Sequence, residues 1–126
     1  MIDINKQIDY WKNGAVNDLE TAELLISGKK HIEGLFFCHL TIEKILKSLV
    51  VKKTNQLAPK THNLNYLYEL SNVKVSDDDI LFLSVLMKYQ LEGRYPDFNP
   101  KVPSIETVND YLCKTKTLFE CLRQML

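Results

Sequence analysis

Apolar residues recur at steps of three and four along most of the chain, and this spacing constrains the fold more than any other feature of the sequence. Such a period places apolar side chains on one face of an α-helix. The first of these stripes comprises Ile4, Ile8, Trp11, Ala15, Leu19, Ala22 and Ile26. We therefore expect a first helix that Asp3 or Asn5 caps and that ends at Gly28.

Two further helices are expected in the middle of the chain. The second should begin near His31 or Ile32 and fade at residues 52–55, where the sequence turns polar. A polar stretch with a proline then separates it from a short helix, which Thr61 is expected to cap. The apolar face of this short helix consists of Leu64, Leu67 and Leu70.

The last two helices are expected on either side of a proline-rich segment. Ser76, followed by three aspartates, is typical of a helix N-terminus, because the hydroxyl caps free amides and the helix dipole favours negative charge. Residues 93–103 hold three of the four prolines and are predicted to form a structured loop. Ser104 then precedes the final stripe, which runs from Ile105 to Leu126.

Four long amphipathic helices and one short helix bury their apolar faces only by packing against one another. The connections between them are mostly short, which favours antiparallel neighbours. The sequence thus predicts an all-α fold, an up-and-down antiparallel helical bundle, that occupies residues 1–126 as a single domain.

The composition narrows the functional classes. Lys and Arg together number 16, as do Asp and Glu, so a zero net charge disfavours broad affinity for nucleic acid but leaves a local basic patch open. The sequence has neither a leader-like N-terminus nor a window of 18 apolar residues, and its three cysteines form no metal-ligand pair. We therefore expect a cytoplasmic protein with reduced thiols, with no membrane and no metal site.

Four stretches, taken together and in this order, resemble the HEPN family, the higher eukaryotes and prokaryotes nucleotide-binding domain. They are Tyr10-Trp11 with Ala15 and Asp18-Leu19, Phe36-Phe37 leading to residues 43–47, Thr61-His62-Asn63-Leu64, and Arg94-Tyr95-Pro96. The resemblance implies a helical bundle that forms a homodimer and is often encoded beside a minimal nucleotidyltransferase, as a toxin–antitoxin or related defence pair. Many relatives are metal-independent ribonucleases.

The chain departs from the family pattern in two places. The ribonucleases carry an arginine, four to six intervening residues and then a histidine, but no histidine follows Arg94 or Arg123. Where relatives often have two glutamines, this chain has His39-Leu40. We therefore expect no catalytic residue of its own and no cofactor.

Glu43, Lys44 and Lys47 are the first group of candidate ligand-binding residues. Glu43 and Lys47 lie one helical turn apart in the order that favours an exposed intrahelical ion pair of little energetic weight. The alternative, which the family name implies, is that Lys44 or Lys47 contacts a phosphate while Glu43 orients the phosphate or a ribose.

His62, Arg94 and Tyr95 are the second group. His62 lies at the start of a helix, where it donates to a phosphate or merely closes the loop. Arg94 offers a guanidinium suited to bidentate phosphate binding, or else ties its loop to a carboxylate such as Asp97, and Tyr95 beside it is placed to stack on a base. His39 is interpreted as a hydrogen-bonded histidine of the core or of a dimer interface.

Three functions from different classes fit these residues. The first is a binding and regulatory module that engages a nucleotide or a nucleotidyltransferase partner. The second is a metal-independent endoribonuclease that cleaves RNA with His62 and Arg94 as a displaced catalytic pair. The third is a structural domain whose role is assembly with another chain.

Overall fold

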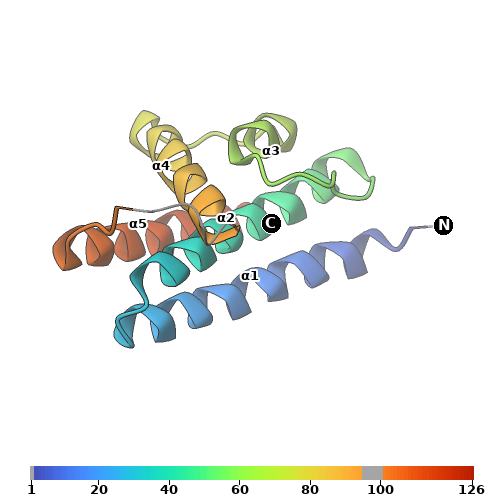
Figure 1. The fold of residues 1–126 in the computed structure, drawn as a ribbon. Helices are drawn as coiled ribbons and strands as arrows, with labels where there is room; N and C mark the ends of the chain where they lie inside the picture. The colour runs from blue at the N-terminus through green and yellow to red at the C-terminus, as the bar shows by residue number, and fades with distance from the viewer. Residues whose placement is uncertain (1, 95–100) are drawn as a thin grey trace.

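The computed structural model describes residues 2–94 and 101–126, and the side chains of all of these except 91–94. Its elements are α1 (Ile4–Ser27), α2 (His31–Thr54), α3 (Leu64–Ser71), α4 (Asp77–Arg94) and α5 (Ile105–Arg123) (Figure 1). Within these residues there is no strand. The predicted all-α bundle of four long helices and one short helix is confirmed.

Most of the predicted helix ends are found at the predicted residues. The side chain of Asp3 accepts a hydrogen bond from the Lys6 amide, and Ser76 and Ser104 cap α4 and α5 in the same way. These side chains satisfy amides that the first turn of a helix leaves without an intrahelical partner.

Two predicted boundaries are wrong. The N-terminal cap of α3 is Asn63, whose Oδ1 accepts a hydrogen bond from the Tyr66 amide at 3.1 Å. The Thr61 hydroxyl accepts from the amide of Asn63, which lies before the first residue of the helix. Helix α4 continues to Arg94, so the predicted loop does not begin at residue 93. The first proline of that segment is Pro96. A proline lacks only its own amide hydrogen, so the helical turn before Pro96 keeps all of its hydrogen-bond donors.

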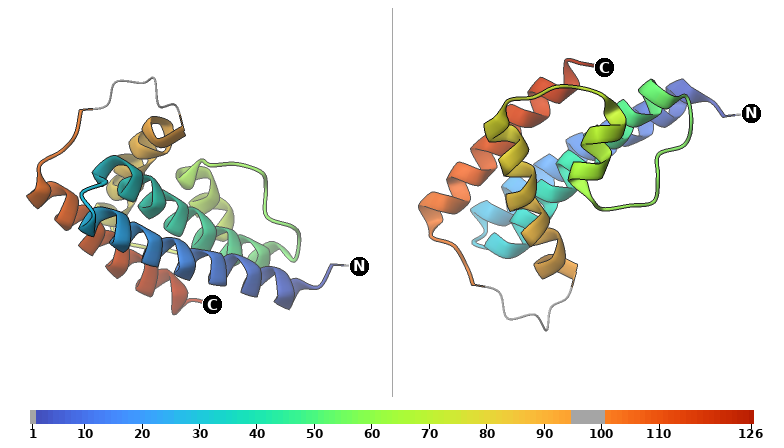
Figure 2. Two further views of the ribbon diagram at one scale, coloured as in Figure 1. Left: turned by 60° about the horizontal axis from the view of Figure 1, so that its bottom comes forward. Right: turned by 90° about the horizontal axis from the view of Figure 1, so that it is seen from above.

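Helix α2 is the centre of the bundle, and every other helix packs against it. Fourteen of its 24 residues are buried, on all of its sides, as expected for a helix enclosed by its neighbours. Helix α1 lies beside α2 and antiparallel to it, α5 lies on another side of α2, and α4 crosses the bundle obliquely (Figure 2). The buried polar side chains in the middle of α2, among them His39, Glu43 and Lys47, therefore lie against other helices or the α2–α3 connection.

A glycine allows α1 and α2 to approach closely where the chain turns between them. A Cβ atom at Gly34 would lie 2.5 Å from Cγ1 of Ile26, a distance that carbon atoms do not tolerate. The short connection of residues 28–30 holds this contact in place, with Lys29 in the left-handed region at a φ of 65°. This close packing fixes the register of the two helices, and so the contacts of Lys44 with Asp18 and of Lys47 with Trp11.

Candidate functional site

The candidate site is a cluster of polar side chains around Glu43, in the middle of α2. The Glu43 side chain is only 4% exposed, and its two oxygens have different partners. Oε2 accepts a hydrogen bond from Nζ of Lys47 at 3.1 Å, while Oε1 lies 2.9 Å from Nδ1 of His62. One buried carboxylate therefore holds both a lysine of its own helix and a histidine from the α2–α3 connection.

His39 strengthens the same attachment of the α2–α3 connection to α2. It is completely buried, and its Nε2 donates to the main-chain carbonyl of His62 at 3.0 Å. Its other ring nitrogen lies 3.8 Å from Oε1 of Glu43. His39 is thus a hydrogen-bonded histidine of the core, one of the two positions the sequence indicated for it. Both the backbone and the side chain of His62 are anchored.

Lys47 is covered by Trp11 of helix α1. Its Nζ lies 4.9 Å from the centroid of the Trp11 ring, a cation–π distance, and 3.1 Å from the carboxylate of Glu43. The lysine is 5% exposed. The expectation of an exposed Glu43–Lys47 pair is therefore wrong, because α1 and the α2–α3 connection cover both residues.

A second ion pair joins α1 to α2 close to this cluster. Nζ of Lys44 lies 2.7 Å from Oδ2 of Asp18, whose side chain is buried, while Lys44 keeps 28% of its side chain exposed. Gly14 makes room for the lysine, since a Cβ there would lie 3.0 Å from Cδ of Lys44. Both lysines that were predicted to bind phosphate are thus held by carboxylates of this chain.

The structure brings together Glu43, Lys44, Lys47 and His62 around the middle of α2. Arg94 ends α4, whose Met87 sulfur accepts the amide of Leu64 at the start of α3, so this helix passes close to the connection that carries His62. The side chain of Arg94, and all of Tyr95 and Asp97, lie outside the described residues. The assignment of these residues to a ligand stays a prediction.

Trp11 and Asp18 belong to the cluster, although neither was predicted to do so. Both residues were part of the family resemblance, but Trp11 was otherwise expected only to pack, and Asp18 had no other expected role. The missed signal is the spacing of Trp11, Ala15, Asp18 and Ala22, which places a carboxylate in the middle of an apolar stripe. A buried carboxylate requires a cation or hydrogen-bond donors from a neighbouring element.

The exposed fraction of the His62 side chain, 47%, distinguishes it from the rest of the cluster. A carboxylate oxygen can only accept, so His62 donates from Nδ1 to Glu43, and this contact fixes the plane of the imidazole. The arrangement presents a histidine of defined orientation at the surface, beside the start of α3. Such a group can hydrogen-bond a ligand or transfer a proton.

Two further features bear on the class of protein. Within residues 2–94 and 101–126, no group of three or more His, Cys, Asp or Glu side chains is arranged to hold a metal ion. None of the described helices combines the length and apolarity that a membrane crossing requires.

Comparisons with known proteins agree with the architecture. The model of the HEPN domain family matches residues 8–125, and the chain therefore belongs to the HEPN family. A solved structure, that of TT1696 from Thermus thermophilus, superposes with a TM-score of 0.81 over 95% of this chain and 98% of that chain. The two are 20% identical, so this likeness concerns the fold. Among curated protein sequences, none matches the chain.

Proposed function

We propose that this HEPN chain is a binding and regulatory module without catalysis of its own, which engages a nucleotide through His62 and Arg94. The observation that carries the proposal is the half-exposed imidazole of His62, fixed in orientation by the buried carboxylate of Glu43 at 2.9 Å. A donor that is oriented before the ligand arrives loses less conformational entropy on binding.

The other candidate cations contribute less to this binding. Lys47 is enclosed by Glu43 and Trp11, and Lys44 is paired with Asp18, so either would have to leave a carboxylate before it contacted a phosphate. Breaking a buried ion pair leaves an uncompensated charge and costs several kcal/mol, about 3 or more. The phosphate contacts therefore fall to Arg94 and His62, and Lys44 and Lys47 act by positioning the cluster.

The experiment is an isothermal titration of the purified chain with ATP and other nucleotides, with and without magnesium. Arg94→Ala and His62→Ala are expected to weaken binding about tenfold or more, which corresponds to the loss of one charge-assisted hydrogen bond. Arg123→Ala is the matched control, because Arg123 is the other arginine of the sequence and pairs with Glu120 on the surface. Wild-type protein that binds no nucleotide at millimolar concentration would refute the nucleotide site.

A nucleotidyltransferase is the partner that family membership favours, in a toxin–antitoxin or related defence pair, with this chain as a homodimer. The decisive test is co-expression and co-purification of this chain with a minimal nucleotidyltransferase, followed by measurement of the mass of the complex. A chain that remains free in the presence of the nucleotidyltransferase would exclude this partner.

The Glu43–His62 contact also favours a second candidate, a metal-independent endoribonuclease. A carboxylate that holds one ring nitrogen of a histidine fixes the tautomer in which the other nitrogen acts as a general base. This activity predicts RNA cleavage in the presence of a chelator and its loss in His62→Ala. RNA that stays intact at high protein concentration would eliminate the nuclease.

A further inference from the structure

Helices α4 and α5 cross rather than lie side by side (Figure 2), and a groove of about 410 Å³ lies between the first half of α4 and the middle of α5. Its volume falls within the range of small-molecule sites, about 300–1,000 Å³. The α4–α5 groove shares no residue with the Glu43 cluster. Its apolar lining residues are Leu81, Phe82, Val85 and Tyr111, and its charged ones are Asp78, Asp79 and Lys114.

The apolar part of the groove combines a packed aromatic pair with an exposed leucine. The rings of Phe82 and Tyr111, one from each helix, lie with their centroids 5.8 Å apart, and Phe82 is only 5% exposed. Leu81 in the same lining is 68% exposed. Removing such apolar surface from water is favourable in proportion to its area, so a ligand with an apolar part is stabilised here.

Asp78 and Asp79 bring two negative charges to the groove, and neither has a partner cation. Among the side chains that the structure describes, no Lys, Arg or His nitrogen lies within 4 Å of either carboxylate. Lys114, the cation of the lining, lies 3.3 Å from Oδ2 of Asp110 on its own helix, so its charge is already offset. The dipole of α4 adds only about half a positive charge at this end. The groove therefore keeps a negative charge.

The ammonium group of Lys114 shows which kind of cation the groove accommodates. It lies 6.0 Å from the centroid of the Phe82 ring and pairs with Asp110, so a protonated amine is held by an aromatic face and a carboxylate together. The lining offers the same two kinds of group a second time, in Tyr111 and the two aspartates of α4. This second set has no amine of the chain to bind.

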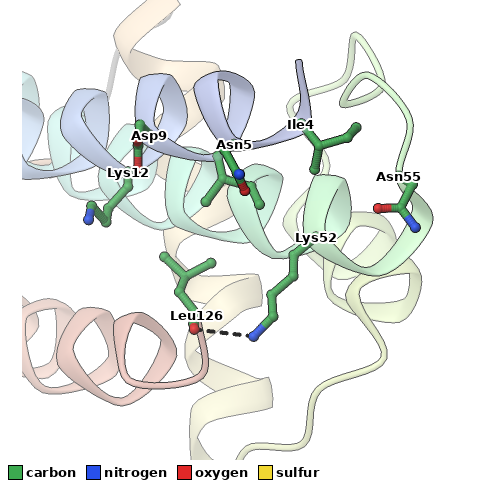
Figure 3. Close-up of a pocket in the computed structure, with 8 residues that line it drawn as sticks. Ile4, Asn5, Asp9, Lys12, Lys52, Asn55 and Leu126 are labelled. Atoms are coloured by element: carbon green, nitrogen blue, oxygen red, sulfur yellow. Dashed lines mark hydrogen bonds between the residues drawn. The ribbon is translucent and has the colours of Figure 1, made fainter. Parts of the chain in front are cut away.

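A larger hollow, of about 510 Å³, lies beside the start of α1, but its polar groups are already engaged. Nζ of Lys52 donates to the carbonyl of Met125 at 2.9 Å and lies 3.2 Å from an oxygen of Leu126, as the dashed line in Figure 3 marks. A ligand there would have to compete with these contacts. The carboxylates of the α4–α5 groove face no such competition from a cation.

We propose that the α4–α5 groove binds a small organic cation, a protonated amine with an apolar part. The ammonium group of the ligand donates to Asp78 and Asp79, and its apolar part covers Leu81 and Tyr111. This site is separate from His62 and Arg94, so the inference goes beyond the proposed function and does not depend on it.

The test is a titration of the isotopically labelled full chain at pH 7, followed by amide chemical shifts, with hexylammonium, 1-hexanol and methylammonium as probes. We expect saturable shifts from hexylammonium at residues 78–85 and at Tyr111 and Lys114. Hexanol lacks the charge and methylammonium lacks the apolar part. Each is expected to bind at least about tenfold more weakly, since each loses one of the two kinds of contact.

Variants locate the binding. The double variant Asp78→Asn, Asp79→Asn is expected to weaken hexylammonium binding about tenfold or more, and Leu81→Ala weakens it with the charge unchanged. Lys114→Gln should tighten binding, because it removes a like charge from the lining. Asp77→Asn is the matched control: Asp77 belongs to the same first turn of α4 but does not line the groove. It should change the affinity less than about twofold, since water and salt screen its charge.

Three results would each overturn the proposal. The first is the absence of a saturable shift from hexylammonium at these amides. The second is hexanol binding as tightly as hexylammonium, which would leave the carboxylates without a role. The third is an equal loss of affinity in Asp77→Asn and in the double variant, which would indicate attraction to the acidic helix end rather than binding in the groove. His62→Ala should bind hexylammonium like wild type.

Discussion

Nδ1 of His62, in the connection between α2 and α3, lies 2.9 Å from Oε1 of Glu43, which is buried in the middle of α2. The other oxygen of the same carboxylate accepts from Lys47. Glu43 and Lys47 are both buried, so the negative charge of Glu43 determines whether the ammonium group of Lys47 is tolerated there, while His62 keeps 47% of its side chain exposed. Stability and the orientation of His62 therefore depend on one side chain.

Glu43→Gln is expected to destabilise the protein by about 3 kcal/mol, because it leaves the ammonium of Lys47 buried without an opposite charge. The measurement is urea unfolding followed by circular dichroism. The double variant Glu43→Gln, Lys47→Met should recover most of the loss, since it removes the unpaired cation and keeps an apolar stem against Trp11.

Glu120→Gln is the matched control for this prediction. Glu120 also pairs with a basic residue of its own helix, Arg123, but both side chains are about half exposed. Water replaces the contact there, so the urea midpoint should hardly move. Equal losses in Glu43→Gln and Glu120→Gln would show that burial does not distinguish the two pairs.

Gly34→Ala is expected to destabilise the protein by about 1–3 kcal/mol, although alanine favours a helix more than glycine does. The new methyl group would lie 2.5 Å from Cγ1 of Ile26, so α1 and α2 would have to separate. Thermal unfolding measures the change. Gly14→Ala is the control, because its methyl group meets only the flexible side chain of Lys44, at 3.0 Å. If Gly14→Ala lost as much stability as Gly34→Ala, close packing of the two helices would not be the cause.

The helices and most caps were predictable because their causes are local. The period of the apolar residues and the hydroxyls of Ser76 and Ser104 act within a turn or two of the chain. The buried state of Glu43 and Lys47 was not predictable from the same spacing. An acid and a base four residues apart look identical in sequence whether they face water or, as here, Trp11 of another helix.

The candidate site could be predicted only as a set of residues. The sequence singled out Glu43, Lys44, Lys47 and His62, and the structure places them around one part of α2. Which of them are held by carboxylates depends on Asp18 and Glu43, and therefore on the packing of α1 and of the α2–α3 connection against α2. That packing is tertiary, and no local pattern encodes it.

Asn63→Ala is expected to cost about 1 kcal/mol of stability, whereas Thr61→Ala should cost less. The side chain of Asn63 accepts from the Tyr66 amide in the first turn of α3, and Thr61 serves only the turn before the helix. Urea unfolding of both variants compares the two residues directly. A larger loss in Thr61→Ala would restore the original sequence-based assignment of the cap.

Cys38 is expected to be unreactive in the folded protein. Burial raises the pKa of its thiol from 9.0 to about 11, the hydrogen bond with Thr115 opposes this only in part, and the thiolate is the reactive form. Cys113 and Cys121 are exposed. At pH 8 a chromogenic disulfide reagent should therefore modify two thiols rapidly in the folded chain and all three in denaturant. Rapid modification of three thiols without denaturant would contradict the burial of Cys38.

The same burial predicts a loss of stability at alkaline pH. Between pH 9.0 and about 11 the thiol of Cys38 is deprotonated in the unfolded chain but still protonated in the folded one. Unfolding then releases a proton, so this group lowers the free energy of unfolding as the pH rises through that range. Cys38→Ala removes the titrating group, and the slope of stability against pH should be shallower in this variant than in wild type. Parallel slopes would mean that other groups account for the alkaline loss.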